Sequence, residues 1–170
     1  MCNFASIVLT KERAFWELDT DSHSEIIARN RINEAGVRGL NVVKVEITPG
    51  PRTVDFDDLE SWDLKFDQDQ FPEWHDPVKS EERARRALAA RAKAGWGNVT
   101  VRSCAALTTF AAPKATSVDV WDCAALTTFA AHKATSVVVG YCDALKTFAA
   151  PKATSVNVWD WDCPNYRRTA

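Results

Sequence analysis

Cys104–Asp122 reads CAALTTFAAPKATSVDVWD, Cys123–Tyr141 reads CAALTTFAAHKATSVVVGY, and Cys142–Asp162 reads CDALKTFAAPKATSVNVWDWD. The cysteines that begin these repeats are 19 residues apart, and the last interval, to Cys163, is 21 residues because Trp-Asp is doubled. A fixed period near twenty residues is typical of a solenoid, in which each coil buries its apolar face only against its neighbours. The repetition therefore predicts shape more directly than activity.

One repeat also predicts the path of one coil. The segment S-V-D-V-W alternates apolar and polar residues, so we expect a short strand with Val118 and Val120 pointing inward. After the strand, Cys123 turns the chain inward, and Leu126 and Phe129 fill the far side. The other repeats have proline at the position of His132, and this proline is expected to turn the chain back at the end of the far side.

The order A-x-x-V-x-V-x-x-C-x-x-L, from Ala115 to Leu126, resembles the leucine-rich repeat, with small apolar residues in the leucine positions and cysteine at the Asn/Cys position. The resemblance covers roughly residues 96–163 and implies a short leucine-rich-repeat-like β-solenoid of about four coils. Both ends of such a stack need caps. Trp96 is the candidate at the front, and residues 159–166 are the candidate at the back.

The repeated cysteines are predicted to form a column, because they occupy the same position in successive coils about 4.8 Å apart. A column does not converge on one point, as the ligands of a tetrahedral zinc ion must. We therefore expect buried, reduced thiols that pack as small apolar side chains.

Residues 1–76 do not repeat and predict an α+β head. Strand-like runs are expected at residues 4–10, 13–18, 42–48 and 62–66. Ser22 and Glu25 match a capping box that opens a helix. Residues 77–95 are expected to form a connecting and capping helix, with Asp76 as its N-cap and Gly95 at its end, and residues 96–170 form the solenoid with a C-terminal cap.

The head contains DSHSEII from Asp21 and DQDQFPEWHDP from Asp67, and with its repeats it resembles uncharacterised small bacteriophage proteins that carry similar cysteine- and alanine-rich repeats. The resemblance spans most of the chain and implies no established activity. It does imply that the protein acts inside an infected bacterium.

Composition limits the classes of partner. A net charge of −2 predicts no bulk affinity for nucleic acid or membranes, and a hydrophobic fraction of 46% is sufficient for a core. The first residues contain no basic segment followed by a long apolar run, so we expect neither a signal peptide nor a membrane span. The expected location is the cytoplasm of the host cell.

The outward residues of the repeated strands are the main candidate site. In register they form columns, of which the third contains Arg102, Trp121, Gly140 and Trp159. The two indoles are expected about 9–10 Å apart, over a gap at the glycine. Exposed aromatics on a polar face are typical anchors of protein interfaces, although shielding of strand ends is the alternative. The predicted binding residues on this face are Arg102, Asp119, Trp121, Asn157, Trp159 and Trp161.

Residues 55–76 carry nine carboxylates against Lys65 alone. Such a surface is suited to a basic host protein, including one that binds nucleic acid, through Asp57, Asp58, Asp67 and Asp69. The alternative is a solvated loop with helix caps, which is how most charged runs fold.

Catalytic and metal motifs are weak in this sequence. Asp67 and Asp69 with His75 and Asp76, joined by His23, lack the glycine and distal glutamate of a calcium loop, and His23 is expected to be exposed. We find no G-x-S-x-G or P-loop pattern. We therefore predict no catalytic residue, no metal and no cofactor.

These observations favour a non-enzymatic protein-binding module. With the bacteriophage resemblance, the hypothesis becomes an inhibitor that occludes a host protein, for example one of a CRISPR-type defence system. The first alternative is a small enzyme or nucleotide-binding head that uses the solenoid for targeting or oligomerisation. The second is a homo-oligomer, formed where coils pair edge to edge.

Overall fold

The computed structural model describes residues 5–36 and 39–159, which divide into two compact units. One unit, the solenoid, contains residues 49–61 and the described chain from Gly95 onward. The other, the head, contains the described residues up to Thr48 and the segment Trp62–Ala94. The segment 49–61, which the sequence assigns to the head, therefore belongs to the solenoid, and the helix expected to connect the two lies within the head.

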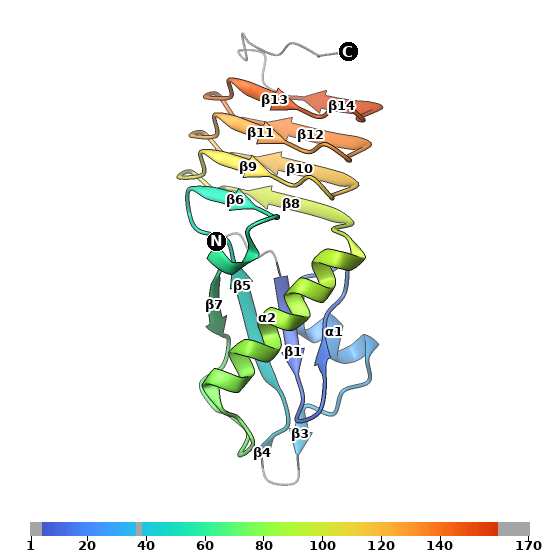
Figure 1. The fold of residues 1–170 in the computed structure, drawn as a ribbon, viewed down its shortest axis with the longest axis vertical. Coiled ribbons are helices and arrows are strands. Elements are labelled where there is room, and N and C mark those ends of the chain that lie inside the picture. Colours follow the sequence, from blue (N-terminus) through green and yellow to red (C-terminus); the bar gives the residue numbers. More distant parts are fainter. Residues whose placement is uncertain (1–4, 37–38, 160–170) are drawn as a thin grey trace. The chain divides into compact units, whose positions relative to one another are not determined.

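The solenoid is a β-solenoid of about three turns, and its first sheet follows the repeated S-V-x-V segment (Figure 1). Its strands are parallel and in register, so that Val118 pairs with Val99 and Val137, and the valines are buried. This confirms the predicted alternation and the 19-residue stacking. The strands are β8 (Asn98–Arg102), β10 (Ser117–Trp121), β12 (Ser136–Gly140) and β14 (Ser155–Val158).

A second parallel sheet lines the far side of the coils, where the sequence predicts only packing residues. It contains β9 (Thr109–Ala111), β11 (Thr128–Ala130) and β13 (Thr147–Ala149). Phe110 and Phe129 stack with ring centroids 5.3 Å apart, and Phe129 and Phe148 with centroids 5.0 Å apart. Stacking of identical residues is thus a direct consequence of the register, and it fills the interior between the two sheets.

The turn after each strand depends on the residue before the cysteine. Ser103, Asp122 and Tyr141 have φ angles of 55°, 55° and 52°, in the left-handed region. Such a residue reverses the direction of the chain at a steric cost that aspartate tolerates better than tyrosine. The turn that we assigned to the cysteine is therefore made by its predecessor.

A strand from residues 49–61 caps the front of the second sheet. In this segment β6 (Thr53–Asp55) pairs in parallel with β9, and η1 (Leu59–Ser61) follows it. Phe56 lies edge-on to Trp96 at a centroid distance of 4.6 Å, and both side chains are buried. Trp96 is thus part of the front cap, as predicted, but the strand that completes the cap comes from far earlier in the chain. The back cap expected at residues 159–166 lies almost entirely outside the described residues.

The head contains a four-stranded antiparallel sheet in the order β2-β1-β5-β7. The strands are β1 (Ala5–Leu9), β2 (Ala14–Phe15), β5 (Val43–Thr48) and β7 (Asp63–Phe66). They confirm the four strand-like runs, although β2 is much shorter than expected. A small pair, β3 (Ala35–Gly36) and β4 (Gly39–Leu40), was not predicted. Every residue of β1 is buried, which shows that both faces of the sheet are covered at this strand.

One helix packs on each face of this sheet. Ile26 of α1 (His23–Arg29) joins Val8 and Val42 in a buried cluster on one face. On the other face, α2 (Pro77–Ala94) packs on β1 and buries the small residues Ala84 and Ala87 (Figure 1). The alanine face of α2, which we expected from the sequence to pack against the first coil, therefore packs on the head's own sheet.

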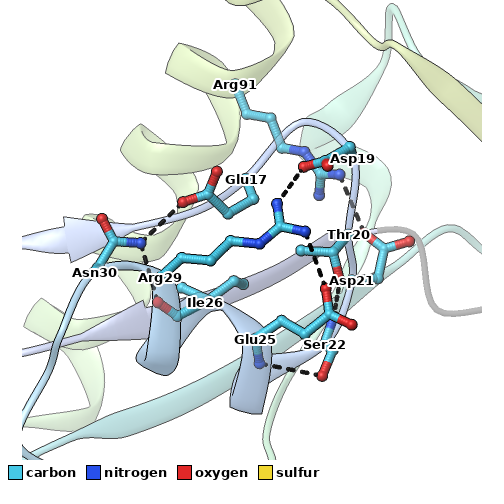
Figure 2. Close-up of polar contacts among 10 residues, drawn as sticks. All are labelled: Glu17, Asp19, Thr20, Asp21, Ser22, Glu25, Ile26, Arg29, Asn30 and Arg91. Carbon is cyan, nitrogen blue, oxygen red and sulfur yellow. Dashed lines mark hydrogen bonds and ion pairs between the residues drawn. The ribbon is translucent and has the colours of Figure 1, made fainter.

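Polar contacts fix the loop that leads into α1 (Figure 2). The side chain of Ser22 accepts a hydrogen bond from the Glu25 amide at 3.3 Å, which confirms the N-cap half of the predicted capping box. The Ser22 amide donates to Oγ1 of Thr20 at 3.1 Å, so the reciprocal half differs from the prediction. Arg29 binds Asp19 at 2.6 Å, and Arg91 of α2 binds Asp21 at 3.1 Å. These contacts join the loop to both helices.

Asp76 caps α2 as predicted, and this makes the head sensitive to acid. The Lys79 amide donates to Oδ1 of Asp76 at 3.1 Å, and this hydrogen bond lowers the pKa of Asp76 below its ordinary value of 3.8. A carboxyl whose pKa is lower in the folded state stabilises that state above the ordinary pKa and loses this effect as the pH falls through the folded pKa. We therefore expect the urea midpoint to fall with acid below pH 3.8, and to fall less in Asp76→Asn, which keeps a capping oxygen but does not titrate. An identical pH profile for the variant would contradict this role.

Candidate protein-binding face of the solenoid

The outward residues of β8, β10, β12 and β14 form the predicted columns. Asp119 pairs with Thr100 and Val138, and Val138 pairs with Asn157. Trp121 pairs with Arg102 and Gly140, and the Trp159 amide donates to the Val139 carbonyl, which continues the ladder. The register therefore brings these candidate residues onto one face of one sheet, with Trp161 outside the described residues.

The aromatic residues on this face form a contiguous group, which we call the aromatic column: Trp121, Tyr141 and Trp159. The ring of Trp121 lies 6.1 Å from that of Trp159 and 5.8 Å from that of Tyr141, between centroids. Tyr141 and Trp159 are each 58% exposed. Large apolar rings exposed side by side on a strand face are unusual outside interfaces.

The expected gap at Gly140 is filled. A Cβ built on Gly140 would lie 2.5 Å from Cζ3 of Trp121, so the indole lies directly on the glycine backbone. The indole tilts across this position toward Trp159, which is why the rings are closer than the 9–10 Å that strand spacing alone predicts. Glycine here is required by the close approach of the ring.

Tyr141 is the member of the column that sequence reasoning missed. It lies after the strand, in the left-handed turn, so the alternation that identifies outward residues does not reach it. In the sequence, the only indication that Tyr141 is exceptional is its position directly before a repeated cysteine, where other repeats have the polar residues Ser103 and Asp122.

An ion pair borders the aromatic column. Nη2 of Arg102 lies 3.1 Å from Oδ2 of Asp119, between neighbouring strands of the face. The Arg102 side chain is 65% exposed, so this pair contributes little to stability but remains available to a partner. Asn157, which is also exposed, adds an amide group on β14, two coils after Asp119.

The acidic segment is divided between the two units. Asp57 and Asp58 lie in the solenoid's front cap, where Asp57 is 3.8 Å from Nζ of Lys114. Asp67 and Asp69 lie in the head. Asp55 and Asp76 accept hydrogen bonds from backbone amides, as turn and helix caps do. The segment therefore shows features of the capped-loop alternative.

The residues weighed as a metal or acid–base group separate into two places. His75 is hydrogen-bonded to Ser80 at 3.0 Å and stacks on Phe71 at 4.3 Å, and burial lowers its pKa. His23 lies elsewhere, beside Asp67, and its side chain is only 10% exposed. The expectation that His23 is exposed is wrong, because the ring folds back onto the sheet.

The cysteine column differs from the prediction at its first position. Cys123 and Cys142 are free and buried, as expected, but Cys104 is disulfide-bonded. The hydrogen bond shared with Cys142 lowers the pKa of Cys123 to about 7, and the same contact raises the pKa of Cys142. The shared hydrogen bond therefore favours loss of the Cys123 proton before that of Cys142, and both thiols are buried inside the coils.

No protein family, curated protein or solved structure matches the chain. None of the helices in the described residues combines the length and apolar character needed to cross a lipid bilayer.

Proposed function

We propose that the chain is a non-enzymatic protein-binding module and that the solenoid face holds its partner. The observation that carries the proposal is the aromatic column, in which two rings remain 58% exposed although each contacts Trp121. Rigid aromatic rings bury much area on binding and lose little conformational entropy. The ion pair of Arg102 and Asp119 provides a polar border beside them, as at the rim of an interface.

The resemblance to small bacteriophage proteins gives this proposal its specific form. The partner is a host protein, and the chain acts as an inhibitor that occludes it, for example in a CRISPR-type defence system. The parallel β-solenoid supports this form, since stacked coils present a rigid face without the ordering cost of a flexible loop.

A nucleotide-binding or enzymatic head is the alternative. The observation in its favour is a pocket of about 390 Å³, lined by Lys11, Arg31, Asn41 and Trp74 among others. Its volume lies within the range of small-molecule sites. Thermal stabilisation of the chain by nucleotides, abolished by Lys11→Ala, would favour this function over the protein-binding one.

The test begins with capture of partners from bacterial lysate, followed by measurement of the affinity for the purified partner. We expect Trp121→Ala with Trp159→Ala to weaken binding at least thirtyfold, because a truncated anchor costs about 2 kcal/mol or more. The matched control is Lys133→Ala with Lys152→Ala, which removes two exposed side chains from the same unit without touching the aromatic column. Equal affinities of the two double variants, both folded by circular dichroism, would contradict the proposal.

A further inference from the structure

Three potential metal ligands meet in the head, well separated in sequence. His23 begins α1, Glu46 lies in the middle of β5, and Asp67 directly follows β7. One donor atom from each lies within 4.8 Å of the others. Neither the fold of the solenoid nor the proposed protein-binding function involves this group, which we call the His23 cluster.

The hydrogen bonds of His23 orient its ring for coordination. Nε2 lies 3.0 Å from the carbonyl oxygen of Val45, and because a carbonyl only accepts, Nε2 carries the proton. The other ring nitrogen, Nδ1, then faces Oδ2 of Asp67, 3.4 Å away. A backbone carbonyl that fixes one ring nitrogen while the other binds metal is the usual arrangement at protein metal sites.

The backbone holds these side chains in place. The Asp67 amide donates to the Lys44 carbonyl at 2.9 Å. The side chain of the next residue, Gln68, also hydrogen-bonds to this part of the backbone. It accepts from the Lys44 amide at 2.7 Å and donates to the Val42 carbonyl at 3.1 Å. His23 is 10% exposed, whereas Asp67 is 47% exposed, so the cluster is rigid on its inner side and open to solvent on its outer side.

The distances suit a small divalent ion. With bonds of about 2.1 Å and tetrahedral angles, neighbouring donors lie about 3.4 Å apart. Nδ1 of His23 and Oδ2 of Asp67 already have this separation. A donor oxygen of Glu46 lies within 4.8 Å of the other two donors. Lys65 pairs with Glu46 across β5 and β7, so this cation would compete with a metal ion for the carboxylate.

We propose that the His23 cluster binds a first-row divalent transition metal ion, with His23, Glu46 and Asp67 as ligands. One imidazole and two carboxylates favour Zn²⁺, Co²⁺ or Mn²⁺, whereas Mg²⁺ and Ca²⁺ prefer oxygen alone. Three protein ligands leave at least one position for water. The ion joins α1, through His23, to Glu46 of β5 and to Asp67 directly after β7.

The test is titration of the full chain with Zn²⁺ by calorimetry and with Co²⁺ by visible absorption. We expect Zn²⁺ to bind at a ratio of one and to raise the thermal midpoint. Asp67→Asn and His23→Gln should each weaken Zn²⁺ binding at least tenfold, while Asp69→Asn, an exposed carboxylate two residues away, should leave it unchanged.

Two results would overturn the site. The first is an absence of Zn²⁺ binding at millimolar concentration by a chain whose circular dichroism shows it to be folded. The second is a Co²⁺ spectrum with thiolate charge-transfer bands, or equal Zn²⁺ affinities for Asp67→Asn and Asp69→Asn, either of which would place the ion elsewhere.

Discussion

Replacing Phe129 with alanine is expected to lower the free energy of unfolding by about 3–5 kcal/mol, the usual cost of removing a buried phenylalanine. The Phe129 ring is fully buried and stacks on a phenylalanine of each neighbouring coil, at centroid distances of 5.3 and 5.0 Å. Its loss leaves a cavity that cannot collapse, because the strands on both sides are fixed by parallel ladders. Urea denaturation followed by circular dichroism measures the effect.

Phe148 is the matched control for this experiment. It has the same neighbours in sequence and stacks on Phe129, but its side chain is only half-buried. Phe148→Ala should therefore cost clearly less than Phe129→Ala. Equal losses, or a loss below about 1 kcal/mol at Phe129, would show that the phenylalanines do not stack inside the coils.

Removing the carboxylate of Asp21 is expected to destabilise the head by about 2–3 kcal/mol. The guanidinium of Arg91 is 4% exposed, and Asp21 lies 3.1 Å from it (Figure 2). Burial raises the pKa of Asp21, against the lowering effect of Arg91, so both charges are partly desolvated. Asp21→Ala removes this partner of the buried Arg91 cation. Because the Asp21 side chain is 41% exposed, we expect a smaller loss of stability than for a fully buried ion pair.

The control removes both charges together. Arg91→Met with Asp21→Ala replaces the pair by apolar groups and should recover most of the stability lost in Asp21→Ala, because no buried charge remains. Chemical denaturation of the wild type, Asp21→Ala, Arg91→Met and the double variant completes the thermodynamic cycle. A double variant less stable than the single one would contradict the assignment of the loss to an uncompensated charge.

The repeats predict most of the solenoid from sequence. A 19-residue period fixes which residues lie over one another, and the alternation in S-V-D-V-W fixes which of them point outward, so the face with Arg102, Asp119 and Trp121 is predictable. The second sheet is not, because T-F-A is too short to show a period of two. The capping strand β6 is also beyond local reasoning, since Thr53–Asp55 pairs with residues more than fifty positions later.

The candidate sites were predictable to different degrees. The two indoles of the aromatic column follow from the register, but Tyr141 depends on a left-handed turn that no alternation reveals. The His23 cluster depends on strand order, because Glu46 and Asp67 approach His23 only after β5 and β7 pair. The sequence hypothesis grouped His23 and Asp67 with Asp69, His75 and Asp76 and did not include Glu46. In the fold His75 packs against Phe71.

The in-register stacking is tested most directly by exciton coupling between Trp121 and Trp159 in far-ultraviolet circular dichroism. These indoles are far apart in the chain and come within 6.1 Å only if the coils stack residue over residue. The measurement uses a Tyr141→Phe background, because the Tyr141 ring also lies 5.8 Å from Trp121. In that background we expect an exciton couplet that is lost to the same extent on adding Trp121→Phe or Trp159→Phe, with both variants folded. A couplet that survives either substitution would contradict the stacking, and the proposed binding face would fail with it.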